Sequence, residues 1–314
     1  MPQLSILIPF TGNEKELEST LVSVLENRPY QCEIIVAHSG NYADPYDLGD
    51  EVSFVQLPEE DLGLGQIIQL TLEHTESPII HLLACGTQVT PGWTRDILDA
   101  FEDPYVGSVC PIVLNEDETV FCIGVENTLL YRNRMLGSNR RMDIRDCDRY
   151  EPVGPSQYAG FYRVDALREI TCLNELSDSL FGLETGLSLE AIGYETKVVD
   201  SALIRLQSDL EVAGDANDSQ TAIWRFAGSL GFAQGLTLSL VGLAADLFTS
   251  PFSGTSRRSL ISRLRKFVDT KTANEFREFV ESARGPVTSG QTLPIQSYKL
   301  ELSGTEAEPT RRAA

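Results

Sequence analysis

The sequence predicts an α/β fold: a mostly parallel sheet covered by helices on both faces, followed by a C-terminal helical extension. Over the first 113 residues, short apolar runs alternate with segments whose apolar residues recur at helical spacing. The runs contain few polar residues, which is typical of strands buried on both faces. In such a sheet, ligands bind where the carboxyl ends of the strands meet.

The predicted elements follow one another in a regular order. The clearest helix places Leu17, Leu21, Val24 and Leu25 on one face. Residues 115–157 are polar and irregular. Strands are expected over residues 4–9, 33–37, 52–57, 79–83, 106–114, 158–164 and 196–200, and helices over 14–27, 66–74, 93–101 and 183–192.

The charge of the chain argues against one class of partner. The 314 residues include 25 Lys and Arg against 46 Asp and Glu, a net charge of −21. Proteins that bind nucleic acid neutralise phosphates with a basic face, so we expect no nucleic-acid partner. The charge is uneven, because residues 251–314 hold 11 basic and 7 acidic residues. The acidity therefore belongs to the first 250 residues.

Cysteine and histidine give little support for a metal site. The six cysteines form no Cys-x-x-Cys pair, so zinc is not expected. His74 and His81 lack partners at metal spacing and are expected to be solvated or satisfied locally. Asp165 is expected to cap a helix. Three cysteines in apolar runs are expected to be small buried side chains: Cys32, Cys110 and Cys122.

A strand that begins almost at the first residue leaves no room for a signal peptide, which predicts a cytoplasmic location. Farther along, residues 226–248 are apolar and residues 259–282 are basic and amphipathic. This combination is typical of segments at a membrane surface. One hypothesis is that residues 226–285 contact the inner membrane face peripherally. A helix that docks on the core or forms a homodimer suits the weaker hydrophobicity of residues 226–248 better.

Several segments together resemble glycosyltransferase family 2, whose members have the GT-A nucleotide-diphospho-sugar fold. They are residues 5–21, 33–36, 63–80, 90–93, 160–167 and 184–194, in that order. The resemblance spans about residues 3–206. It implies transfer of a sugar from a nucleotide-sugar donor to the hydroxyl of a glycan or lipid acceptor. The expected organisation is a GT-A-like domain over 1–208, a helical extension over 219–284 and a disordered tail over 285–314.

The resemblance also implies which residues form the site. Glu184 stands in the motif that usually holds the catalytic base, with Thr185 and Gly186 as its neighbours. His38 and Ser39 follow the second strand, where the family has an acidic loop for the nucleobase, and Gln69 replaces the usual Asn. The implied nucleotide-sugar-binding residues are Pro9, Glu14, His38, Ser39, Gln69, Ala84 and Gly86.

The chain departs from the family at the metal motif. Members usually hold Mg²⁺ or Mn²⁺ with an Asp-x-Asp pair after the fourth strand. Here that pair is replaced by Ala84 and Gly86, on either side of Cys85. Because neither side chain can ligate a cation, we expect no metal from these positions and no other cofactor. Transfer would then be metal-independent or lost.

Three interpretations follow from this degenerate motif. One is a pseudoenzyme of the same fold that binds a sugar nucleotide or glycan without turnover. A second is a transferase in which basic side chains offset the diphosphate charge, and a third is a scaffold that uses the C-terminal helices. The candidate cations lie in a loop that also contains Asp143, Asp146 and Asp148, so a solvated loop is the alternative. They are Arg132, Arg134, Arg140 and Arg141.

Overall fold

The computed structural model describes residues 2–10, 12–40, 42, 44–59, 62–127, 133–136, 150–176, 178–207 and 279. Its strands are β1 (Leu4–Pro9), β2 (Cys32–His38), β3 (Ser53–Gln56), β4 (Ile79–Leu83), β5 (Thr87–Val89), β6 (Val106–Leu114), β7 (Val120–Cys122), β8 (Gly124–Asn127), β9 (Asn133–Leu136), β10 (Ala159–Arg163) and β11 (Glu195–Leu206). Its helices are α1 (Glu14–Glu26), α2 (Leu64–Leu72), α3 (Arg95–Ala100), α4 (Val164–Glu169), η2 (Leu173–Glu175), η3 (Asp178–Leu180) and α5 (Phe181–Ala191). The predicted α/β alternation is confirmed.

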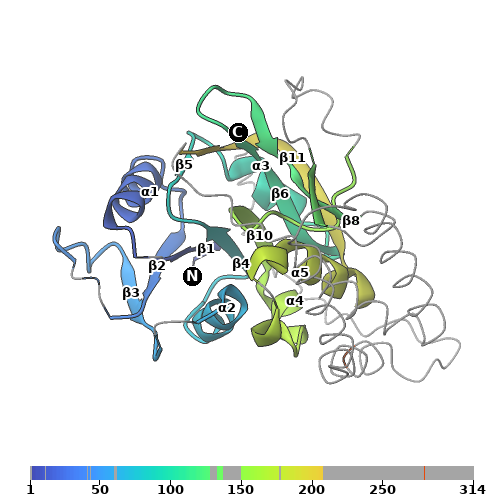
Figure 1. Ribbon diagram of the computed structural model, residues 1–314, viewed down its shortest axis with the longest axis horizontal. Coiled ribbons are helices and arrows are strands. Elements are labelled where there is room, and N and C mark those ends of the chain that lie inside the picture. The colour runs from blue at the N-terminus through green and yellow to red at the C-terminus, as the bar shows by residue number, and fades with distance from the viewer. Residues whose placement is uncertain are drawn as a thin grey trace, which may run out of the picture. The chain divides into compact units, whose positions relative to one another are not determined.

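One mixed sheet of nine strands organises the fold, in the order β3-β2-β1-β4-β10-β6-β11-β5, with β7 paired to β6 (Figure 1). Strand β1 lies between β2 and β4 and is parallel to both. The antiparallel β10 separates this part of the sheet from β6. Because β1, β2 and β4 run in the same direction, their carboxyl ends share one edge of the sheet. The candidate site residues around Pro9, His38 and Ala84 follow those ends.

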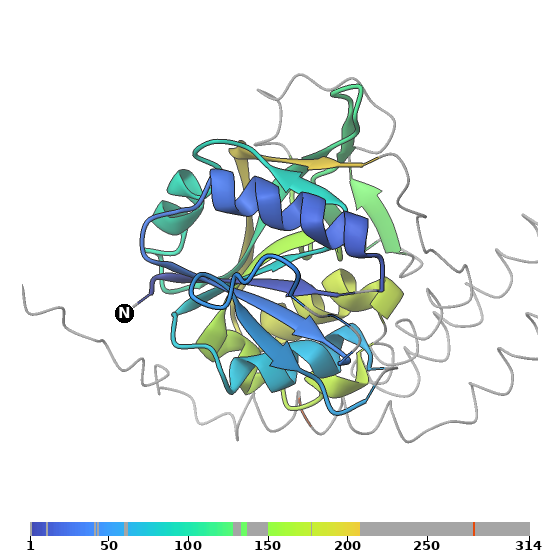
Figure 2. The ribbon, with the colours of Figure 1, turned by 90° about the vertical axis from the view of Figure 1, so that its left-hand side faces the viewer.

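Helices cover both faces of the sheet, as expected. Figure 2 shows α1 and α3 on one face and α2, α4 and α5 on the other. The α1 face has its own core, in which Leu17, Leu21 and Val24 are at most 3% exposed. A second core on the opposite face contains Ile68 and Leu183. The helical spacing of apolar residues therefore identified the buried side of α1 correctly.

The strands between residues 115 and 136 were not expected. Strands β7, β8 and β9 are only three or four residues long, so they provide too few positions for a periodic pattern. Strands β8 and β9 pair as a separate two-stranded sheet. Strand β11 is longer than predicted because it continues past polar Asp200 and Ser201. The register with β6 shifts there, between Val199 and Leu203.

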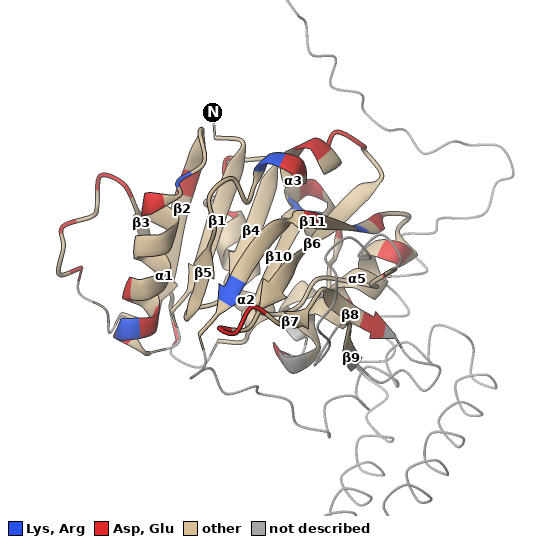
Figure 3. Cartoon of the chain, turned by 90° about the horizontal axis from the view of Figure 1, so that it is seen from above, with Lys and Arg blue, Asp and Glu red and all other residues tan. Residues whose placement is uncertain are grey.

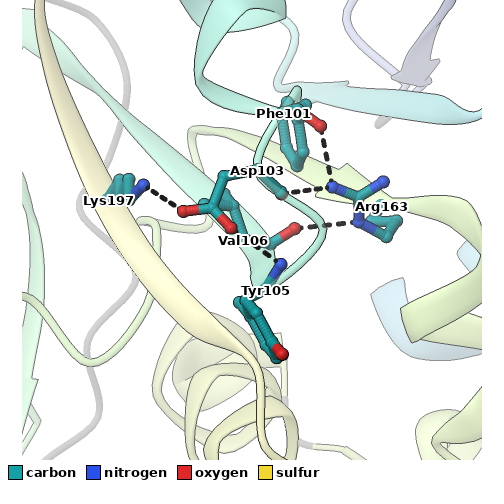
Figure 4. A network of polar contacts seen from close by, with 6 residues as sticks. All are labelled: Phe101, Asp103, Tyr105, Val106, Arg163 and Lys197. Carbon is teal, nitrogen blue, oxygen red and sulfur yellow. Dashed lines mark hydrogen bonds and ion pairs between the residues drawn. The ribbon is translucent and has the colours of Figure 1, made fainter. Parts of the chain in front are cut away.

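Arg163 at the end of β10 fixes one end of the α3 segment to the sheet (Figure 4). Its Nε donates to the carbonyl of Val106 at 2.9 Å, and its Nη2 donates to the carbonyls of Phe101 and Asp103 at 2.9 and 2.8 Å. Lys197 on β11 adds an ion pair with Asp103 at 2.8 Å. The hydrogen bond from Lys197 is the main reason that the pKa of Asp103 is lowered. One side chain thus satisfies three backbone acceptors that follow α3.

One prediction for this region is wrong, and others fall outside the described residues. Asp165 does not cap a helix, because α4 begins at Val164 and its N-cap is Arg163; Asp165 lies in the first turn and pairs with Arg168. The helical extension and tail lie outside the described residues except for Phe279, which is buried in the second core. The side chains of the predicted Arg cluster also lie outside them. Among the described helices, none is long and apolar enough to cross a membrane.

Candidate functional site

The ends of β1, β2 and β4 are joined by direct contacts at the carboxyl edge of the sheet. The amide of Phe10 donates to the carbonyl of Ala37 at 2.8 Å, which links the ends of β1 and β2. The thiol of Cys85 donates to the carbonyl of Pro9 at 3.1 Å, which links the turn after β4 to β1. Predicted site residues from three separate motifs therefore meet at one edge.

An aromatic cluster lies beside this edge, next to β2 and β3. Tyr42 and Phe54 are stacked, with ring centroids 5.6 Å apart and planes inclined by 25°. Phe10 contacts Tyr42 at 5.4 Å, and the His38 ring lies 6.4 Å from both Tyr42 and Phe54. Flat side chains at the carboxyl ends of strands can accommodate a planar ligand such as a nucleobase.

His38 is held in its neutral form by its surroundings. Burial lowers its pKa. The amide of Gly40 donates to Nδ1 at 3.1 Å, so this nitrogen is the acceptor and the proton lies on Nε2. The backbone of His38 also pairs with β3, because its carbonyl accepts from the amide of Leu57 at 2.7 Å. His38 thus presents a fixed neutral ring with one N–H donor.

The 84–86 turn, which follows β4, is bonded closely to α1. The amide of Gly86 donates to Oγ1 of Thr20 at 2.9 Å and lies 3.3 Å from the carbonyl of Glu16. Gly86 has a φ of +80°, in the left-handed region that favours glycine. The amide of Ala84 is bonded to the carbonyl of Tyr158 at 2.9 Å. Backbone bonds to neighbouring elements therefore determine the conformation of this turn.

A divalent cation does not fit the residues of this turn. Ala84 and Gly86 have no side-chain donor, and Gly86 is buried. Across the part of the chain that the structure describes, no three His, Cys, Asp or Glu side chains are grouped as metal ligands. Hard cations require several oxygen ligands, which these positions do not supply. No catalytic step can therefore be assigned to a metal at this turn.

The other predicted donor residues are more dispersed. Glu14 is the first residue of α1 and is exposed, next to the carboxyl edge. Ser39 follows His38 and is half-buried. Gln69 is exposed on α2, which covers the opposite face of the sheet from α1. The edge therefore assembles Pro9, His38 and the 84–86 turn, but Gln69 belongs to another surface.

Glu184 lies in the first turn of α5 and is fully buried. Two glycines allow α5 to pack directly on the segment before β10. A Cβ on Gly182 would lie 1.8 Å from the carbonyl oxygen of Pro155, and one on Gly186 would lie 2.1 Å from that of Val153. This close contact fixes the position of Glu184 relative to the sheet. In this conformation its carboxylate is not exposed to an acceptor.

Sequence reasoning missed the aromatic part of the site. Phe10, Tyr42 and Phe54 are separated by long stretches of chain, and no spacing rule connects them. Their positions relative to the strands could have identified them, because each lies on or just beyond one of three adjacent strands. Only the strand order β3-β2-β1 brings them together.

Comparisons with known proteins agree with this architecture. The chain matches the model of glycosyl transferase family 2 over residues 5–171, more than half of its length, and it belongs to that family. A search of curated protein sequences finds no match. The family match covers β1 to α4 and thus includes the carboxyl edge and the 84–86 turn.

Solved structures show the same fold at low sequence identity. A crystal structure of GalNAc-T7 with UDP, GalNAc and Mn²⁺ has a TM-score of 0.61 at 12% identity, covering 90% of this chain and 55% of that one. TarS of S. aureus, residues 1–349, has a TM-score of 0.52 at 14% identity, covering 90% and 91%. A structure described as S. aureus TarS has a TM-score of 0.55 at 15% identity, covering 90% and 53%. This chain therefore spans about half of the GalNAc-T7 chain.

Proposed function

We propose that the chain binds a nucleotide-sugar donor at the carboxyl edge of β1, β2 and β4, and that it transfers the sugar without a metal held by the 84–86 turn. The aromatic cluster carries the proposal. It places the half-buried rings of Phe10 and Phe54 around Tyr42, which is 8% exposed, and His38 adds one N–H donor. A nucleobase requires both a flat apolar contact and a few hydrogen bonds.

The absence of carboxylates at the turn supports the second half of the proposal. A metal-dependent donor site uses its cation to offset the charge of the diphosphate. Ala84 and Gly86 cannot hold such an ion, and the amide of Gly86 already donates to Thr20. We therefore propose that protein groups, and not an ion held at this turn, offset the charge of the diphosphate. The similarity to GalNAc-T7, whose structure contains UDP and Mn²⁺, supports a nucleotide-sugar as the donor. It does not identify residues of this chain that would bind the ion.

Transfer requires a base for the acceptor hydroxyl, and we propose Glu184 for this role. Its carboxylate would accept the hydroxyl proton of a glycan or lipid acceptor as the oxygen attacks the anomeric carbon. The bond from that carbon to the diphosphate breaks, and the nucleoside diphosphate leaves with the electron pair. Because Glu184 is fully buried here, this role requires a conformation in which α5 exposes it.

Binding of the donor can be tested by calorimetry with UDP-sugars and GDP-sugars, in EDTA and in Mn²⁺. We expect at least one donor to bind with the same affinity in both buffers. Tyr42→Leu should weaken it about tenfold, because Tyr42 supports the Phe10 and Phe54 rings on which a base can stack, and base stacking contributes about 1–3 kcal/mol. Tyr30→Leu removes an exposed tyrosine outside the cluster, and circular dichroism must show that Tyr42→Leu keeps the wild-type fold, because Tyr42 is buried. Binding only in Mn²⁺, or none at all, would contradict the proposed site.

Turnover is tested separately with the donor that binds. Release of the nucleoside diphosphate should be measurable in EDTA and should be lost in Glu184→Gln. Equal rates in wild type and Glu184→Gln would remove this residue from the mechanism. Donor binding without any release of product would leave a sugar-nucleotide-binding protein and reject the transfer step.

A further inference from the structure

A groove lies along the outer side of α1 and has no role in the proposed donor site. Its volume is about 610 Å³, which is within the usual range of ligand sites. It is lined by α1 from Lys15 to Asn27, by the loop containing Tyr46, and by Gln88 and Arg205 of β5 and β11. The groove therefore begins near the carboxyl edge of the sheet and follows the helix towards the opposite edge.

Two exposed apolar side chains face this groove. The described residues include four large apolar or aromatic side chains that are exposed, and two of them, Val22 and Tyr46, line it. Val22 is 54% exposed on α1, with Glu18 and Glu26 one turn away on either side. A β-branched residue is a poor choice for the exposed face of a helix, and the core of the fold does not require this one.

The loop that presents Tyr46 is held in a defined conformation. The Asp44 carboxylate accepts hydrogen bonds from the amide of Tyr46 at 3.1 Å and from the amide of Leu48 at 2.5 Å. The ring is 61% exposed although its backbone is fixed. A fixed aromatic face loses little conformational freedom when a ligand stacks on it.

The uncharged polar groups of the groove are side-chain amides and hydroxyls. Oγ of Ser19 accepts from Nε2 of Gln88 at 3.0 Å and from Nε2 of Gln207 at 2.7 Å. The oxygen of the Gln88 amide remains a possible acceptor for a ligand hydroxyl. An extended peptide is a poorer fit for β5, because the amide of Val89 already donates to Oγ of Ser23 at 3.3 Å.

The charges that line the groove are balanced. Lys15 and Arg205 offset Glu18 and Glu26, so the lining has no net charge, whereas the whole chain has −21. Figure 3 shows both signs of charge on α1. Arg205 also forms an ion pair with Glu118, which lies outside the lining, at 2.8 Å. Such a lining favours a polar ligand without charge over an anion or a basic peptide.

We propose that this groove is a second carbohydrate site, which binds a neutral oligosaccharide. The C–H face of a pyranose ring would stack on Tyr46 and contact Val22. Its hydroxyls would pair with the amide of Gln88 and the carboxylates that line α1. The site is separate from the donor edge, so the proposal does not rest on donor binding or on turnover.

The test uses the full chain on an array of neutral and anionic glycans, followed by calorimetry with the neutral oligosaccharides that bind. We expect Tyr46→Ala to weaken binding about tenfold, because the stacked ring is lost, and Val22→Glu to weaken it as well. Tyr30→Ala is the control, because it removes an exposed tyrosine outside the groove. Both lining residues are exposed, so their variants should fold.

This inference would be overturned if no neutral glycan binds, if only anionic glycans bind, or if Tyr46→Ala binds as wild type does. The donor site is distinguished in the same experiment. Saturating UDP or GDP should leave oligosaccharide binding unchanged. Loss of oligosaccharide binding in saturating nucleotide would place the sugar at the donor edge and would also overturn the proposal.

Discussion

Replacing His81 by Asn should make this fold less sensitive to acid. His81 lies on β4 between β1 and β10 and is fully buried. Its ring stacks on Phe161 with centroids 3.8 Å apart, and its Nδ1 lies 3.1 Å from the carbonyl oxygen of Gly160. This carbonyl can only accept, so Nδ1 carries the proton. The neutral ring has no partner at Nε2, and a second proton there would be buried without one.

The size of the effect follows from the pKa. Burial lowers the pKa of His81 from 6.5 to about 3. The unfolded chain therefore binds a proton as the pH falls below 6.5, whereas the folded chain does not until the pH nears 3. Stability is thus lost as the pH falls through this window. The full pKa shift corresponds to a loss of about 5 kcal/mol in the free energy of unfolding. Between about pH 7 and pH 5 the loss is about 2 kcal/mol.

Urea denaturation, followed by circular dichroism at several pH values, measures how the free energy of unfolding depends on pH. Wild type should lose about 2 kcal/mol more than His81→Asn between about pH 7 and pH 5. Asn can still donate to Gly160, and His81→Phe is a second variant that keeps a ring on Phe161. His74→Asn removes an exposed histidine and should retain the wild-type profile. Parallel profiles for wild type and both His81 variants would refute the reasoning.

Other predictions concern the packing of the fold and can be measured by the same denaturation assay. Arg163→Met should lower the free energy of unfolding by about 3 kcal/mol, because three backbone carbonyls lose a charged donor. A decrease below about 1 kcal/mol would show that water replaces the guanidinium. Gly182→Ala should cost about 3 kcal/mol or more, because its Cβ would lie 1.8 Å from the carbonyl oxygen of Pro155. Gly193→Ala is the control for that variant, because no atom lies within 4 Å of the position that a Cβ would take there. Its φ of +95° disfavours alanine, so this variant should lower the free energy of unfolding by only about 1 kcal/mol. Equal costs for the two glycines would argue against close packing of α5.

The first half of the fold could be predicted because its elements leave strong local signals. Strands such as β1 and β4 are continuous apolar runs, and α1 repeats Leu17, Leu21 and Val24 at helical spacing. The predicted ends of these elements differ from the observed ends by at most two residues. Strands β7 to β9 could not be predicted, because pairing with distant segments and not their own sequence stabilises such short strands.

The sequence could propose candidate site residues only where they stand at motif positions. His38 and the 84–86 turn were proposed because each follows a predicted strand and stands at a position that the family uses. The burial of Glu184 could not be foreseen, because it depends on how closely α5 approaches residues 153–155. The groove on α1 was also missed, since Tyr46 and Arg205 come from segments far apart in the chain.

The sequence by itself determined the α/β class and the family, because these are properties of residue types in order along the chain. The tertiary structure alone decided which side chains share a surface. The strand order brings Phe10, Tyr42 and Phe54 together at one edge, and the same packing buries His81 and Glu184. The physical reason is that burial and contact depend on distances through space, which local periodicity does not contain.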